Sequence, residues 1–145
     1  MESNLQYKGK YIYNWFSNFE PITIIIDNVK YPSVENYYQS QKTLDLEERK
    51  QFQNCSPSKS KFLGKKVKLR KDWDNIKNSI MKKALDIKFA KGTNQANKLL
   101  ETGNDEIIEW NNWGDRIWGK TLDGIGENRL GIMLMDIRNK LKENE

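Results

Sequence analysis

The chain has 145 residues, with 25 lysines and arginines against 20 acidic residues, a formal net charge of +5 and a pI near 9.2. We expect a single domain spanning 1–145, because a chain of this length can bury about two-thirds of its unfolded surface. There is no histidine and one cysteine, Cys55. This excludes a His-based catalytic triad, a His-ligated zinc site and an intramolecular disulfide.

The positive charge favours an anionic partner but does not choose among a nucleotide, a nucleic acid and a phosphorylated metabolite. No run of 18 apolar residues occurs, and the first six residues lack the charged-then-apolar order of a signal peptide. We therefore expect a cytoplasmic protein with no membrane partner.

Residues 7–29 favour extended structure. Residues 11–13 could form a short strand, and 22–26 are rich in β-branched residues. Asp27-Asn28 is a turn signal before 29–31, so a β-hairpin is predicted. The loop 17–21 places capping and turn residues around Phe19, which is typical either of a ligand-facing loop or of a plain turn with an aromatic plug.

A helix is predicted from Ser33 to Lys42. Pro32 disfavours helix in the residue before it, and the Ser33 hydroxyl can cap the first turn. One narrow stripe of this helix would gather Glu35, Tyr38, Gln39 and Lys42. Glu35 and Lys42 would lie about 10 Å apart along the axis. The opposite face, expected to point to water, consists of Asn36, Ser40 and Thr43.

Five more helices are predicted from caps and apolar spacing. They span 45–52, 57–64 after a Ser56 cap, 72–91 before Gly92, 93–102 before Gly103, and 127–142. The long one should bury a stripe of Trp73, Ile76, Ile80, Ala84 and Ile87. Residues 106–109 could form a brief strand, and 110–119 a structured loop. Helices outweigh strands without βαβ alternation, so the class is α+β, a mainly helical domain around a small β-sheet or hairpin.

Lysines and one arginine dominate the stretch from Lys59 to Lys71, which contains no acidic residue. Such a run forms either a solvated basic face or a phosphate-binding one. The last helix begins near Gly126 and Asn128, where free backbone N–H groups could receive a phosphate or a ribose hydroxyl.

Several motifs occur in the order typical of one family. They are Trp15-Phe-Ser-Asn-Phe-Glu-Pro21, Val34-Glu-Asn-Tyr-Tyr-Gln-Ser-Gln-Lys42, Ser56-Pro-Ser-Lys-Ser-Lys-Phe-Leu-Gly64, Lys88-Phe89, Leu99-Leu-Glu-Thr-Gly103, Asp115-Arg-Ile-Trp-Gly119 and Asn128-Arg-Leu-Gly-Ile-Met-Leu-Met-Asp-Ile-Arg138. Over roughly 16–141 the chain resembles the NADAR family. That family includes N-glycosidases of ribosylated riboflavin-pathway intermediates and hydrolases that remove ADP-ribose from guanine.

The resemblance implies an N-glycosidase without cofactor or metal. The preferred substrate is an ADP-ribosyl guanine or a related conjugate, carried by a nucleic acid or not. A phosphoribosylated riboflavin-pathway aminopyrimidine is the alternative, and a non-catalytic binder of ADP-ribose or NAD derivatives is a third. The implied substrate-binding residues are Ser17, Asn18, Phe19, Tyr38, Gln39, Trp73, Trp118, Gly119 and Asn128.

Three residues are the catalytic candidates. Breaking an N-glycosidic bond builds positive charge on the anomeric carbon, so a carboxylate beside it is needed. Glu35, in a first helical turn, suits an ionised stabiliser or base. Asp115, between Trp113 and Trp118, could be a desolvated acid or simply a loop cap.

The resemblance assigns Lys42 a part in catalysis, as an amine that attacks the sugar and forms a Schiff base. That amine must be neutral, which requires burial or a cationic neighbour, and Glu35 would oppose this. Without the resemblance, we would interpret Lys42 as a phosphate ligand. A further alternative is that Glu35 and Lys42 are ordinary solvated charges beside a half-buried helix. Two positions depart from the family pattern, Asn36 where a histidine is common and Lys120 where a small residue is common.

Overall fold

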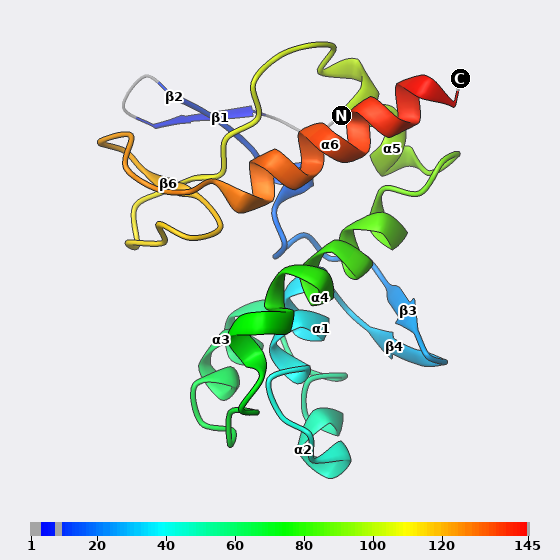
Figure 1. Cartoon of the computed structure of the whole chain (residues 1–145), viewed down its shortest axis with the longest axis vertical. Coiled ribbons are helices and arrows are strands. Elements are labelled where there is room, and N and C mark those ends of the chain that lie inside the picture. The colour runs from blue at the N-terminus through cyan, green and yellow to red at the C-terminus, as the bar shows by residue number, and fades with distance from the viewer. Residues whose placement is uncertain (1–3, 8–9, 145) are drawn as a thin grey trace. The chain divides into compact units, whose positions relative to one another are not determined.

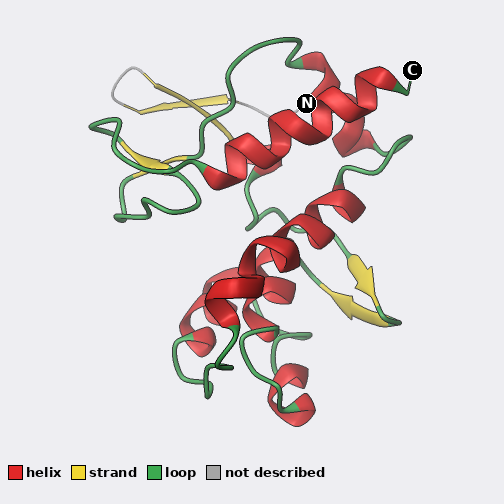
Figure 2. Cartoon of the chain, in the orientation of Figure 1, coloured by secondary structure: helices red, strands yellow, loops and turns green. Residues whose placement is uncertain are grey.

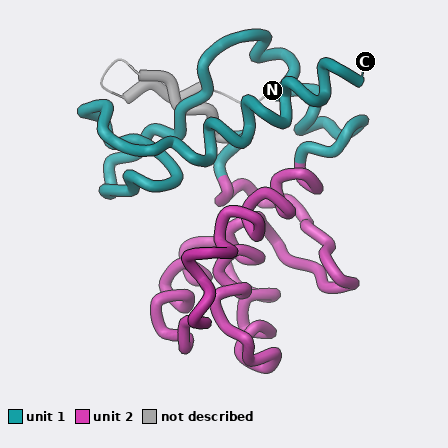
Figure 3. The backbone as a smooth tube through the Cα atoms, in the orientation of Figure 1, with its two compact units in different colours: residues 1–17, 89–145 teal, residues 18–88 magenta. Residues whose placement is uncertain are grey.

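The computed structural model describes residues 4–7 and 10–144, with side chains from residue 15 onward. The chain divides into two compact units, one formed by 1–17 with 89–145 (unit 1) and the other by 18–88 (unit 2) (Figure 3). Helices predominate in both, and the strands described are short (Figure 2). The fold class is α+β, as the sequence predicts. None of the described helices is long and apolar enough to cross a membrane.

Unit 2 starts with a hairpin and continues with helices (Figure 1). Its elements are β3 (Ile24–Ile26), β4 (Val29–Tyr31), α1 (Val34–Ser40), α2 (Leu46–Lys50), α3 (Pro57–Gly64) and α4 (Trp73–Lys88). β3 and β4 pair antiparallel, and Asp27 and Asn28 both have positive φ, 53° and 64°. A two-residue turn of that kind matches the twist of the strands. The predicted hairpin is confirmed.

The predicted caps of unit 2 are present. Ser33 accepts a hydrogen bond from the Asn36 N–H, and Ser56 accepts one from Lys59 with Pro57 in the first turn. Asp45 caps α2 in the same way. Each cap satisfies a backbone donor that the helix itself leaves unpaired. α2 nevertheless ends at Lys50 rather than at Phe52.

The expectation that one face of α1 points to water is wrong. Asn36 and Ser40 are 0% exposed and Thr43 is 1% exposed, because α2, α3, α4 and β4 all pack around this helix. The Asn36 amide donates to the carbonyl oxygens of Phe52 and Cys55, both at 2.9 Å. The polar residues of this face therefore serve as buried hydrogen-bonding groups.

Two helix predictions of unit 2 differ in extent or rotation. α1 ends at Ser40, and Lys42 follows its C-cap in a turn in which the Lys42 N–H donates to Gln39 O at 3.2 Å. α4 ends at Lys88 and buries Trp73, Met81, Ala84, Leu85 and Lys88. The predicted isoleucines of α4 are only half-buried, because the packing of α1 and β3 selects a face that the apolar spacing does not fix.

Unit 1 places one long helix beside short elements and loops. Its elements are β1 (Asn4–Tyr7), β2 (Lys10–Tyr13), the 3₁₀ turn η1 (Asn14–Phe16), α5 (Asn94–Glu101), β5 (Trp110–Asn111), β6 (Lys120–Thr121) and α6 (Arg129–Glu143). β1 and β2 are antiparallel, whereas β5 and β6 are parallel. The predicted strand at 11–13 is β2, while β1 was not predicted.

The prediction of a strand at 106–109 is wrong. Those residues form no strand, and the Asn128 side chain bonds two of their backbone groups. Asn128 Nδ2 donates to Ile107 O at 2.9 Å, and the Glu109 N–H donates to Asn128 Oδ1 at 3.0 Å. The short strand β5 begins directly after them, at Trp110, inside the stretch predicted to be a loop.

We predict that Asn36→Ala lowers the free energy of unfolding by about 2 kcal/mol, because two buried carbonyl groups lose their donor. Urea unfolding followed by circular dichroism measures the change. Asn75→Ala, at an exposed position of α4, is the matched control and should change stability little. Equal stability of the two variants would contradict the structural role of Asn36.

Candidate functional site

Lys42 lies beside two aromatic rings in unit 2. Its Nζ is 5.9 Å from the ring centroid of Tyr38 and 5.9 Å from that of Trp73. The two rings themselves pack at 5.0 Å with a 58° tilt. Ring faces at this distance attract a cation. Trp73 is only 6% exposed, which favours the core role that its helix position predicts over stacking on a ligand.

Glu35 is buried in the first turn of α1, with 7% of its surface exposed. Its Oε2 accepts a hydrogen bond from Gln39 Nε2 at 2.7 Å, and its backbone N–H donates to Asn18 O at 3.0 Å. The carboxylate is thus shielded from water and held by an amide donor. The view of Glu35 as an ordinary solvated charge is therefore wrong.

The environment of Lys42 disfavours its ammonium form. Burial lowers its pKa from the ordinary lysine value, since desolvation penalises the charged state. The Glu35 carboxylate opposes this and raises the pKa. Three cationic neighbours, Lys65, Lys61 and Lys77, lower it further. Part of the basic run, together with a lysine of α4, thus acts electrostatically on Lys42, a role that the sequence did not reveal.

The rest of the basic run has mixed roles. Lys59, Lys65, Lys66, Lys68 and Lys71 are exposed. Arg70 instead pairs with Asp72 at 2.7 Å, and its backbone N–H donates to Lys42 O at 2.8 Å. Arg70 therefore helps to fix the segment after α1.

The loop 17–21 is anchored on both sides of Phe19. Asn18 is buried, and its Nδ2 donates to Met81 Sδ at 3.5 Å. Glu20 pairs at 3.4 Å with Lys88, whose side chain is 0% exposed. Phe19 itself is 37% exposed, so it does not plug the core. Its ligand-facing role, and that of the half-buried Ser17, stay predictions.

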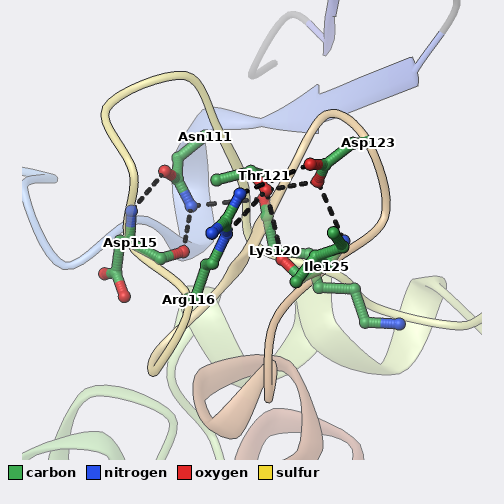
Figure 4. A network of polar contacts seen from close by, with 7 residues as sticks. All are labelled: Asn111, Asp115, Arg116, Lys120, Thr121, Asp123 and Ile125. Atoms are coloured by element: carbon green, nitrogen blue, oxygen red, sulfur yellow. Dashed lines mark hydrogen bonds and ion pairs between the residues drawn. The ribbon is translucent and has the colours of Figure 1, made fainter.

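In unit 1, one buried asparagine organises the loop between β5 and β6 (Figure 4). Asn111 Nδ2 donates to Asp115 O at 2.7 Å and to Lys120 O at 3.2 Å. Its Oδ1 accepts from the N–H groups of Asp115 and Trp113. No sequence motif singled out Asn111, although an asparagine among tryptophans and glycines is typical of a loop held by side-chain hydrogen bonds.

The Asp115 carboxylate caps the same loop. Its Oδ1 accepts from the N–H groups of Ile117 at 3.0 Å and Trp118 at 2.9 Å. This is the loop-capping alternative. Trp113 is 59% exposed and Trp118 is half-buried. Trp113 therefore does not shield the Asp115 carboxyl from water, as the acid role would require.

The outer part of this loop is tied by Arg116, whose guanidinium donates to Thr121 at 3.3 Å and to Asp123 at 3.4 Å (Figure 4). Thr121 also donates to Asp123. This hydrogen bond lowers the pKa of the Asp123 carboxyl, and backbone donation from Ile125 adds to the effect. The loop is thus braced by its own polar residues.

The N-terminus of α6 is already occupied. The N–H groups of Asn128, Arg129 and Leu130 donate to the carbonyl oxygens of Gly119, Ile117 and Trp118. The expectation of free N–H groups for a phosphate or a ribose is therefore wrong. The Asn128 side chain also forms hydrogen bonds with the backbone of the 107–109 segment. Packing requires glycine at position 119, because a Cβ there would lie 2.1 Å from Glu109 O.

The structure thus groups the candidates within each unit. Unit 2 holds Asn18, Phe19, Glu35, Tyr38, Gln39, Lys42 and Trp73. Unit 1 holds Ser17, Asp115, Trp118, Gly119 and Asn128. In unit 2, Glu35 contacts Gln39, and Lys42 lies against the Tyr38 and Trp73 rings. In unit 1, the Asp115 carboxylate binds the Trp118 backbone.

Comparison with known proteins places this geometry in context. A family model described as the NADAR domain matches residues 6–142. The N-glycosidase YbiA of Escherichia coli (strain K12) is 36% identical over 132 residues, covering 89% of this chain and 82% of YbiA. A riboflavin biosynthesis protein of Vibrio vulnificus is 31% identical over 153 residues, covering 99% of this chain and 41% of that protein. The NMR structure of E. coli YbiA matches with a TM-score of 0.81 and 34% identity, covering 90% of this chain and 79% of that one.

We predict that changes of charge around Lys42 move its titration in opposite directions. Lys65→Gln should raise the Lys42 pKa, because it removes a cationic neighbour, and Glu35→Gln should lower it, because it removes the carboxylate that favours the ammonium. NMR of the lysine side-chain nitrogens across a pH series measures both shifts. Lys68→Gln, exposed farther along the run, is the control. Shifts of the same sign in both variants would contradict the assignment.

Proposed function

The chain belongs to the NADAR family and is an N-glycosidase, and from that premise we propose that it removes ADP-ribose from guanine bases or from a related ADP-ribosyl conjugate. The observation that carries the proposal is a buried carboxylate, Glu35, that acts electrostatically on a desolvated amine, Lys42, which also has three cationic neighbours. A carboxylate suits the positive charge that develops when a glycosidic bond breaks. An amine can attack the same carbon, and the cations suit a polyanionic leaving or retained group.

The cations favour an ADP-ribosyl substrate in particular. Lys61, Lys65 and Lys77 all act on Lys42 electrostatically. A pyrophosphate carries more negative charge than a single phosphate ester, so several cations suit it better. The exposed lysines of the same run would suit the phosphates of a nucleic acid that carries the modified base.

Glu35 would act on the anomeric carbon. Positive charge develops there as the bond to the base nitrogen breaks, and an ionised carboxylate already held by Gln39 stabilises that charge without rearrangement. The departing nitrogen takes the bonding electron pair and a proton. The acid role of Asp115 stays a prediction, because its carboxylate caps a loop of unit 1.

Lys42 offers a covalent route to the same products. Its neutral amine would attack the anomeric carbon, and the base would leave with the electron pair of the broken bond. Loss of a proton and opening of the ribose ring then give a Schiff base, which water hydrolyses to release the sugar and restore the amine. Burial and cationic neighbours lower the Lys42 pKa, so the neutral amine is present at a lower pH than for an exposed lysine.

A phosphoribosylated riboflavin-pathway aminopyrimidine is the second candidate substrate. It is supported by the match to the riboflavin biosynthesis protein of Vibrio vulnificus. The same carboxylate and amine would serve its N-glycosidic bond, and its single phosphate would need fewer of the cations. A binder of ADP-ribose or NAD derivatives that turns nothing over is a third reading, in which Glu35 and Lys42 only position the ligand.

We predict that the protein releases free ADP-ribose from an oligonucleotide carrying ADP-ribosylated guanine. Glu35→Gln should reduce the rate about a hundredfold or more, because transition-state charge loses its partner. Chromatography of the released ADP-ribose measures both. Turnover of the aminopyrimidine with unchanged oligonucleotide would favour the second substrate, and tight binding of ADP-ribose without turnover of either would favour the binder.

We further predict that borohydride traps a covalent adduct during turnover, and that Lys42→Ala abolishes it. Intact-protein mass spectrometry detects the added mass and peptide mapping locates it. Lys30→Ala, exposed on β4 and outside the basic run, is the matched control and should be trapped as the parent protein is. If Lys42→Ala keeps its activity and no adduct forms in the parent protein, the reaction proceeds by direct attack of water instead.

A further inference from the structure

α3 approaches α1 closely at the contact of Gly64 with Gln39. Gly64 is buried at the end of α3, and a Cβ there would lie 1.9 Å from Gln39 Oε1 and 2.8 Å from its Cδ. Gly64 is not among the described residues with positive φ, so its backbone does not require glycine. Glycine is required here because the Gln39 side chain occupies the space that a Cβ would need.

The Gln39 amide is oriented by this contact. Its Nε2 donates to Glu35 Oε2 at 2.7 Å, whereas its buried Oε1 accepts no hydrogen bond from the described residues. Only the NH₂ end of an amide can donate to a carboxylate, and the reverse orientation would place two oxygens together. The oxygen therefore faces the gap left by Gly64, and the donor faces Glu35.

We propose that Gly64 and Gln39 are positioning residues for the Glu35 carboxylate. Gly64 leaves room for one orientation of the Gln39 amide, and that amide holds Glu35 ionised and fixed in its buried position. This inference rests on the proposed function, in which Glu35 stabilises the developing positive charge. It applies equally to an ADP-ribosyl and to a phosphoribosyl substrate, because Glu35 faces the sugar in both.

Gly64→Ala tests the proposal. The added methyl displaces the Gln39 amide, so kcat should fall about tenfold or more, with a smaller change in KM, because a hydrogen bond to a charged group is lost. The acidic limb of the pH profile of kcat should move to higher pH, since a carboxylate without its donor takes up a proton more readily. Ser58→Ala, exposed on the same helix, is the matched control and should change neither.

A double-mutant cycle separates positioning from a general packing defect. In a Gln39→Ala background the clash disappears, because the two atoms nearest the new methyl are removed and the Gln39 Cβ lies 3.4 Å from it. Gly64→Ala should then cost no further activity. The proposal is overturned if Gly64→Ala alone leaves kcat and its pH profile unchanged, or if it costs the same factor in both backgrounds.

Gln39→Leu provides a route that does not depend on whether Gly64→Ala folds. It keeps a similar volume but removes the donor, so it should reproduce the fall in kcat and the shift of the acidic limb. A parent-like profile for this variant would overturn the proposal.

Carbon NMR of the Glu35 carboxyl during a pH titration provides a readout without substrate. The Glu35 titration should move to higher pH in Gly64→Ala and in Gln39→Leu, and stay unchanged in Ser58→Ala. If the parent protein turns over none of the substrates, the proposed function fails while this titration still decides the positioning roles.

Discussion

The burial of α1 on all sides is the constraint from which the candidate site follows. All seven of its residues are buried. A helix this short is not stable alone in water, so its surroundings must hold it in place. They do so through a cap at Ser33 and through hydrogen bonds of buried side chains such as Asn36. The carboxylate of Glu35 shares this enclosed environment, where an interaction with a neighbouring charge or dipole is stronger than in water.

The chemistry of Lys42 follows from a balance within that environment. Desolvation and three cationic neighbours favour the neutral amine, while Glu35 favours the ammonium. The packed rings of Tyr38 and Trp73 lie at cation–π distance from the same group. Lys42 is thus a lysine whose charge state responds to its neighbours, a property that surface lysines lack because water screens their surroundings.

Unit 1 fixes its irregular segments with buried asparagines. Asn111 binds the loop that carries Asp115, and Asn128 binds the 107–109 segment. The loop carbonyls in turn accept the first N–H groups of α6. Backbone groups without a regular ladder need such partners when they are buried. The consequence is that residues expected to meet a substrate already have structural bonds, Asn128 most of all.

The sequence by itself determined the features that depend on neighbouring residues in the chain. These are the caps at Ser33, Asp45 and Ser56, the turn at Asp27-Asn28, the helical spacing of α4 and α6, the α+β class and the family motifs. Tertiary structure alone decided which faces are buried, because a polar residue such as Asn36 is stable inside only where a distant carbonyl accepts its hydrogen bond. It also decided the Lys42 environment and the fit of Gln39 against Gly64, since these arise from side chains far apart in the sequence, and no local pattern encodes the distance between them.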